Sequence, residues 1–110
     1  MTQDLIDPSV FEELQEAMGP DFAAELLDTF LGDAANMFAD LDQAAAEGDP
    51  DGYRRAAHSI KSNAQTFGAQ VLGDQAREME LSGEIDPAAV TALRATFDTT
   101  ARALEGLKDG

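Results

Sequence analysis

Apolar side chains recur every three or four residues along most of this chain, which is the spacing that gives an α-helix one hydrophobic face. Five stretches carry the pattern, and turn-forming residues separate them. The pattern predicts helices over residues 8–18, 21–47, 51–67, 69–82 and 87–107, of which the first is short.

The helix boundaries are marked by aspartate, proline and glycine. Three expected helix starts share an Asp-Pro pair, at Asp7-Pro8, Asp49-Pro50 and Asp86-Pro87. An aspartate before the first turn accepts bonds from free backbone N–H groups, and a proline in that turn has no N–H to leave unpaired. A fourth start is expected at Gly19-Pro20. The glycines expected to end helices are Gly19, Gly48, Gly68 and Gly83.

The apolar stripe of each helix predicts which side chains face the core. The stripe residues, helix by helix, are Phe11, Leu14 and Met18; Phe22, Leu26, Phe30, Ala34, Met37 or Phe38, Leu41 and Ala45; Tyr53, Ala56, Ile60, Ala64 and Phe67; Leu72, Ala76 and Met79; and Val90, Leu93, Phe97, Ala101 and Leu104. Four long helices joined by short loops pack as antiparallel neighbours. The sequence therefore predicts an all-α, up-down four-helix bundle with a short extra N-terminal helix, formed as a single domain by residues 1–110.

Composition supports this fold and narrows the function. Alanine and leucine dominate while valine and isoleucine are scarce, which favours helices over strands. The 22 acidic residues exceed the 7 basic ones, and the net charge of −15 argues against binding to nucleic acid or to a membrane surface. There is no cysteine, no long apolar run and no secretory signal. We expect a cytoplasmic monomer.

The single histidine, His58, stands out on the third predicted helix. At helical spacing it faces away from the stripe that runs from Tyr53 to Phe67. Five polar residues fall within about 60° of it on the same helix: Arg54, Arg55, Lys61, Ser62 and Gln65.

This arrangement suits phosphoryl chemistry. A solvent-facing imidazole can act as a nucleophile toward a phosphoryl group, and neighbouring cations can neutralise the phosphohistidine that forms. Small Ser59 and Ser62 leave space for a partner to reach the ring. From helical phase and composition alone, an ordinary surface histidine on a solvated face remains an alternative.

The segment from Ala57 to Ala69, Ala-His-Ser-Ile-Lys-Ser-Asn-Ala-Gln-Thr-Phe-Gly-Ala, resembles the active segment of histidine-containing phosphotransfer (HPt) domains. The family pattern is His-x-Leu-Lys-Gly, followed at the helix end by an apolar residue and Gly-Ala. His58, Lys61 and the run from Phe67 to Ala69 fall in register with it. The resemblance extends over most of the chain.

The resemblance implies a four-helix bundle in which His58 accepts a phosphoryl group from a receiver-domain aspartate and passes it to another receiver. Lys61 would stabilise the phosphate, and Gly68 would form the turn after the active helix. The implied partners are response-regulator receiver domains and a hybrid histidine kinase. No cofactor or metal is implied, and catalysis would come from the partner, so the chain would be a carrier and not an enzyme.

The chain departs from the family pattern in ways that matter for the site. Ser62 replaces the usual glycine, and its hydroxyl can narrow access to the ring, bond the carbonyl of His58 or bond the phosphoryl group. Ile60 replaces leucine conservatively. In some members a polar side chain of the next helix orients the histidine. Glu80 is a counterpart by position, but we leave it out of the predicted site because an anion is a poor neighbour for a phosphoryl group.

Other functions stay open at this stage. A helical binding module without phosphate chemistry is one alternative, and the phosphoacceptor domain of a histidine kinase is another. The acidic run from Glu47 to Gly52 lacks the closing glutamate of a calcium loop, and no Glu-x-x-His pair for a di-iron site exists.

Partner docking is expected on an apolar patch of the first two helices, with Val10, Phe11 and Phe22 as candidate contacts. Receiver surfaces are commonly acidic around their aspartate, as this chain is, so charge is expected to contribute only modestly to docking.

Overall fold

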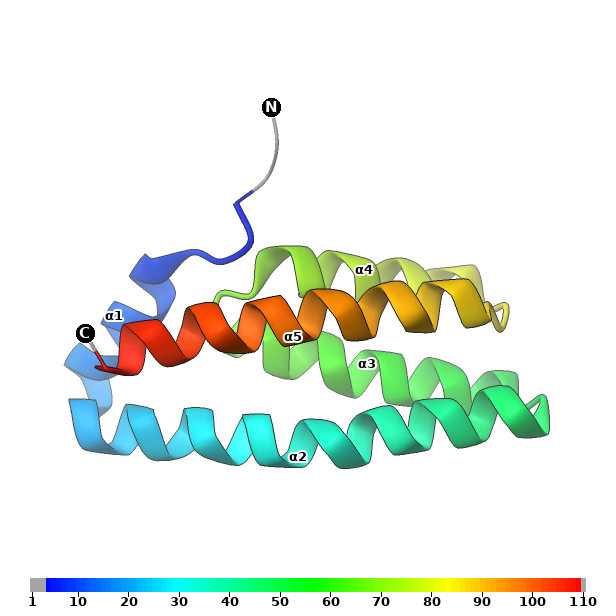
Figure 1. The fold of residues 1–110 in the computed structure, drawn as a ribbon, viewed down its shortest axis with the longest axis horizontal. Helices are drawn as coiled ribbons and strands as arrows, with labels where there is room; N and C mark the ends of the chain where they lie inside the picture. The colour runs from blue at the N-terminus through cyan, green and yellow to red at the C-terminus, as the bar shows by residue number, and fades with distance from the viewer. Residues whose placement is uncertain (1–3, 110) are drawn as a thin grey trace.

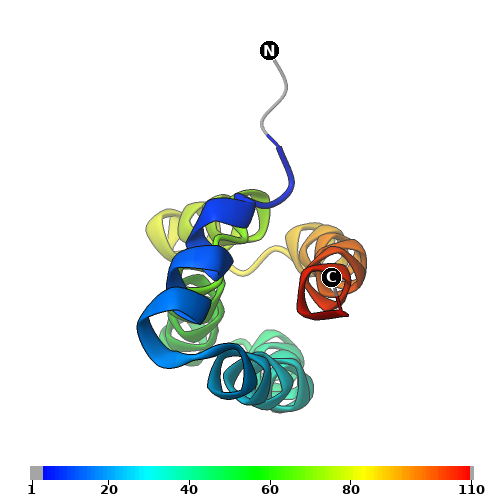
Figure 2. The same cartoon turned by 90° about the vertical axis from the view of Figure 1, so that its left-hand side faces the viewer.

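The computed structural model describes residues 4–109, which form an all-α fold; residues 1–3 and 110 of the predicted domain lie outside the described part. The helices are α1 (Pro8–Met18), α2 (Pro20–Glu47), α3 (Pro50–Thr66), α4 (Gln70–Ser82) and α5 (Pro87–Asp109). Helices α2 to α5 run alternately in opposite directions (Figure 1). Viewed along their axes they stand around a common centre, with α1 across one end (Figure 2). The predicted up-down bundle with an extra N-terminal helix is confirmed.

Local sequence signals set the helix boundaries as expected. The carboxylates of Asp7, Asp49 and Asp86 each accept a backbone N–H at 3.0–3.1 Å, and the residue after each aspartate is the first-turn proline. Gly48 and Gly83 end α2 and α4 in the left-handed conformation, which avoids the steric penalty that a β-carbon would meet there. Helix bounds were therefore predictable to within a residue or two.

The core lies between α2, α3, α4 and α5 and is completed at one end by α1. Phe30 stacks on Phe67 with ring centroids 5.2 Å apart, and Phe97 meets Phe30 edge-on at 6.0 Å. Where α3 and α4 cross, a β-carbon on Gly73 would lie 3.7 Å from the Ala64 side chain, so small residues allow these helices to approach closely. Within residues 4–109, no helix is long and apolar enough to cross a membrane.

The core stripe at the start of α2 differs from the prediction. Phe22, expected in the core, is 44% exposed, whereas Ala23 and Leu27 are fully buried. The predicted stripe stepped by four residues from Phe22 to Leu26 to Phe30. A step of four residues turns about 400° around the helix, so repeated steps of four move away from a fixed face. The buried residues at the start of α2 are instead spaced by alternating steps of four and three residues, which keeps them on one face.

The segment before α1 is tied to the turn between α3 and α4. Asp7 donates its backbone N–H to the carbonyl of Gly68 at 2.8 Å, and the side chain of Gln70 donates to the carbonyl of Asp4 at 3.1 Å. Gly68 has a φ of +72°, and a β-carbon on it would stand 2.6 Å from the Asp7 carbonyl oxygen and 2.9 Å from the Val10 β-carbon. Glycine is thus required both for the turn and for the contact with α1.

Candidate functional site

His58 lies on the outward face of α3, near the middle of the bundle. Its side chain is 59% exposed, while Ala56 and Ile60 on the opposite side of the helix are buried. The apolar side chains hold α3 in the orientation that helical phase predicts. The structure confirms that the histidine faces solvent.

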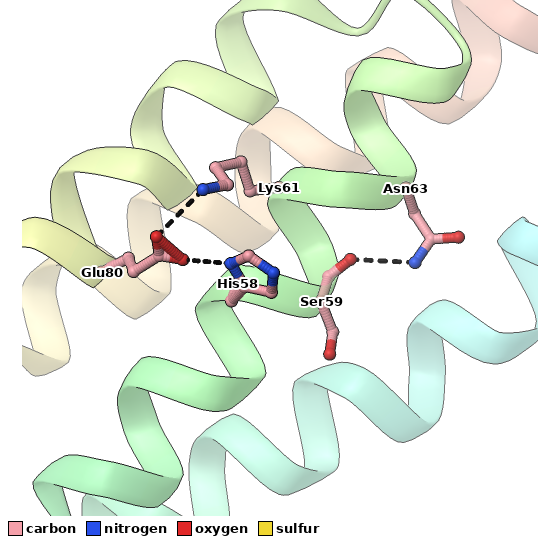
Figure 3. A network of polar contacts seen from close by, with 5 residues as sticks. All are labelled: His58, Ser59, Lys61, Asn63 and Glu80. Atoms are coloured by element: carbon pink, nitrogen blue, oxygen red, sulfur yellow. Dashed lines mark hydrogen bonds and ion pairs between the residues drawn. The ribbon is translucent and has the colours of Figure 1, made fainter.

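A carboxylate of the next helix, Glu80 on α4, bridges the predicted reactive pair (Figure 3). Its Oε2 lies 2.5 Å from Nδ1 of His58, and its Oε1 accepts a hydrogen bond from Nζ of Lys61 at 2.9 Å. The side chains of Glu80 and Lys61 are only 18% and 17% exposed, so this bridge is largely shielded from solvent while the imidazole projects beyond it.

The bridge determines which ring nitrogen of His58 is available. The hydrogen bond from Lys61, and then that from His58, hold the pKa of Glu80 below its ordinary value, so the carboxylate is ionised at neutral pH. An ionised carboxylate can only accept hydrogen bonds, and Nδ1 must therefore carry the proton. In the neutral ring the lone pair is then on Nε2, which is directed away from Glu80 (Figure 3).

The exclusion of Glu80 from the predicted site was wrong. The carboxylate contacts Nδ1 and leaves Nε2 free, and its charge is balanced by Lys61. A positional signal existed in the sequence, because Glu80 follows Ala76 by four residues and so flanks the buried stripe of α4.

The two arginines of α3 are exposed and lie near the ring. Arg54 donates to a carboxylate oxygen of Asp51 at 3.4 Å, and Arg55 is exposed. A shallow hollow is lined by Arg54, Arg55, His58, Ser59, Glu80 and Leu81. The structure therefore brings both predicted cations to the rim of the imidazole.

The other predicted surroundings differ in their distance from the ring. Ser62 is exposed, and its backbone carbonyl accepts the hydroxyl of Thr66 at 3.1 Å. Gln65 lies seven residues after His58, about 10 Å along the helix, and its side chain packs toward Gly73 on α4. Gln65 is thus not a neighbour of the ring in this structure.

The predicted docking residues do not form one exposed patch. Phe11 is fully buried in the core, because its position on α1 faces the bundle, so its prediction as a contact residue was wrong. Val10 packs beside Gly68 and is partly buried, whereas Phe22 is exposed near the start of α2. Among residues 4–109, no three His, Asp or Glu side chains gather in a way that would hold a metal ion.

An all-helical bundle that presents one exposed histidine beside a lysine, with the ring oriented by hydrogen bonding, has the architecture of histidine phosphotransfer carriers. Residues 25–103 match the family model described as Hpt domain, and the chain belongs to this family. It is a histidine phosphotransfer protein of the phosphorelay type.

A solved structure supports the assignment over the whole chain. The crystal structure of histidine-containing phosphotransfer protein B (HptB) from Pseudomonas aeruginosa PAO1 matches with a TM-score of 0.89 and 29% sequence identity. The match covers 98% of this chain and 97% of that one. No curated protein matches the chain. Proteins of the Hpt family carry phosphoryl groups and interact with receiver domains and kinases of two-component relays.

Proposed function

We propose that His58 is the phosphoacceptor of this carrier and that Nε2 is the atom that bonds to phosphorus. The observation that carries the proposal is the contact between Nδ1 of His58 and Glu80, which leaves Nε2 with the lone pair at an exposed ring. Lys61 donates a hydrogen bond to the same carboxylate, which holds its charge near the ring.

The transfer requires few groups from this chain. The Nε2 lone pair attacks the phosphorus of an aspartyl phosphate on a receiver domain. The N–P bond forms as the P–O bond to the aspartyl carboxylate breaks, and the carboxylate leaves with the electron pair. Nδ1 keeps its proton and donates it in a hydrogen bond to Glu80 throughout, so the carboxylate stabilises the positive charge that develops on the ring.

The proposed phosphoryl transfer runs from one receiver domain through this chain to another. The chain accepts from the receiver of a hybrid histidine kinase and donates to a second receiver by the reverse of the same step. It acts as a single-domain monomer in the cytoplasm. Magnesium and the remaining catalytic groups are supplied by the receiver, since the site described here contributes a nucleophile, a positioning carboxylate and cations.

The direct test is transfer of labelled phosphate from a phosphorylated receiver domain to the wild-type chain and to His58→Gln. Because His58 is exposed and off the core stripe, His58→Gln should fold normally and lose all labelling. The label on the wild-type chain should be acid-labile and stable in alkali, as expected of a phosphoramidate bond.

Ser59→Ala and Ser62→Ala are matched controls, since both serines are exposed on the same helix. Both variants should keep the label. Acid-stable label, or label that survives His58→Gln, would reject the mechanism and favour the helical binding module instead.

A further inference from the structure

We infer that the receiver domain docks on the α3–α4 face of the bundle, where exposed Leu81 inserts into an apolar pocket of the receiver and Arg54 and Arg55 meet its acidic rim. This inference rests on the proposed function, because it takes His58 as the centre of the interface. It moves docking away from α1 and the start of α2, where the sequence had suggested it.

Leu81 is the most exposed large apolar side chain of the described residues, at 67%. It is adjacent to Glu80, the partner of His58, and it lines the same hollow as His58 and the two arginines. Leu81 lies opposite the buried stripe of α4, so the bundle does not need it. An exposed leucine beside a reactive group is suited to contact a partner.

The distribution of charge distinguishes this face from the rest of the molecule. No lysine, arginine or histidine precedes Arg54 in the sequence, whereas 14 of the 22 acidic residues do. The surface of α1 and α2 is therefore acidic throughout. The surface of α3 around His58 differs, because it carries Arg54, Arg55 and Lys61. On α4, Arg77 lies one turn before Leu81. A receiver that presents carboxylates around its aspartate is attracted to this group of basic residues.

Distance places Phe22, the exposed residue of the alternative patch, outside an interface centred on His58. Helices α2 and α3 are antiparallel neighbours; Phe22 lies 25 residues before their shared turn and His58 lies eight residues after the start of α3. Phe22 is thus about 25 Å from His58 along the bundle axis. A standard interface of about 800 Å² on each partner reaches only about 16 Å from its centre. Leu81, next to Glu80, lies well inside that reach.

The side of the site that faces α2 is less suitable. A hollow between α2 and α3 is lined by Asp40, Glu47 and Asp49 together with Arg55. Its carboxylates would repel an acidic receiver that approached His58 from α2. The exposed Leu81 lies on the α4 side, where both arginines line the same hollow as His58.

The experiment measures kcat/KM for phosphoryl transfer from an aspartyl-phosphorylated receiver domain to Leu81→Ala, to Arg54→Gln/Arg55→Gln and to the matched control Phe22→Ala. Leu81→Ala should lower kcat/KM about tenfold, the effect of losing one central apolar contact. Phe22→Ala, which also removes an exposed apolar side chain, should leave it unchanged.

Salt dependence tests the role of the arginines. Added NaCl weakens both the repulsion from the net charge and the local attraction. Arg54→Gln/Arg55→Gln loses part of the local attraction and keeps the repulsion, so NaCl should increase its transfer rate more than that of the wild type. Equal salt dependence in the two proteins would contradict the role of the arginines.

Phosphoramidate, a small donor that needs no docking surface, separates this inference from the proposed function. It should label the wild type and Leu81→Ala at equal rates. Failure of both phosphoramidate and the phosphorylated receiver to label wild-type His58 would reject the proposed phosphoacceptor. Normal labelling combined with wild-type receiver transfer by Leu81→Ala, or a loss of transfer in Phe22→Ala, would overturn the docking surface alone.

Discussion

At the scale of single residues, the site depends on one carboxylate that contacts two different groups. Glu80 holds Nδ1 of His58 through one oxygen and Nζ of Lys61 through the other. In the free protein, Lys61 is therefore neutralised before any phosphate arrives. A phosphoryl group on Nε2 carries more charge than the carboxylate and competes with it for the ammonium group.

Replacing Lys61 by alanine should weaken the phosphorylated state more than the free protein. The loss of one charge-assisted hydrogen bond at a partly shielded site corresponds to about 1–2 kcal/mol. Transfer or the lifetime of the phosphohistidine should fall about 5–30-fold, as measured by the decay of label on the purified chain. Lys61→Arg keeps the charge and serves as the control. A wild-type lifetime in Lys61→Ala would show that the ammonium group does not stabilise the phosphate.

The carboxylate should also make stability depend on pH in a defined direction. Hydrogen bonds from Lys61 and His58 lower the pKa of Glu80 in the folded state, so the unfolded chain binds its proton more readily. The ionised bridge thus stabilises the fold above the ordinary carboxyl pKa, and this contribution is lost as pH falls through the lowered pKa.

Urea denaturation of the wild type and Glu80→Gln measures that contribution. The wild type should be more stable at neutral pH, and the difference should disappear in acid, where a protonated glutamate resembles glutamine. A difference that stayed constant across this range would show that the bridge does not contribute through ionisation.

At the scale of elements, the turn between α3 and α4 connects the reactive helix to the N-terminal segment. The Gly68 carbonyl accepts the N–H of Asp7, and Val10 packs directly against the glycine. Helix α1 therefore braces the end of α3, ten residues after His58. This contact explains why the short first helix belongs to the bundle although it adds no residue to the reactive site.

Gly68→Ala should be more destabilising than the same change at Gly83. Both glycines have a positive φ, of +72° and +68°, so alanine adds about 1–2 kcal/mol of backbone strain at either position. At Gly83 nothing lies within 4 Å of the new β-carbon, whereas at Gly68 it would meet the Asp7 carbonyl at 2.6 Å. We expect a total loss of about 2–4 kcal/mol at Gly68, measured by thermal or urea unfolding. Equal losses would mean that α1 does not pack against the turn.

At the scale of the whole molecule, charge is distributed very unevenly. The net charge is −15, and all seven lysines and arginines lie at or after residue 54. Helices α1 and α2 are thus acidic along their whole length, and their carboxylates repel one another. This self-repulsion destabilises the compact state.

Added NaCl should therefore raise the melting temperature of the protein. Screening shortens the range of repulsion to about 8–10 Å near physiological ionic strength. The loss of exposed ion pairs is smaller in total, because few of them join residues 4–109. Thermal unfolding by circular dichroism at increasing NaCl provides the measurement. A melting temperature that fell with NaCl would show that local ion pairs outweigh the net charge.

Much of this protein is determined locally by its sequence. The Asp-Pro pairs and the glycines place the helix ends because caps and turns involve only neighbouring residues. The exposure of His58 follows from helical phase alone, since Ile60 and Ala64 lie on the opposite face of the same helix and are buried. These features require no knowledge of how the helices pack.

Only the tertiary structure decided the features that depend on contacts between helices. Glu80 lies 22 residues after His58 in the sequence. The packing of α4 against α3 brings its carboxylate to Nδ1, where it orients the ring. Packing likewise exposes Phe22 and leaves Leu81 beside the reactive ring. Periodicity identifies the apolar side of a helix, but the rotation and axial position of each helix are set by the side chains of its neighbours.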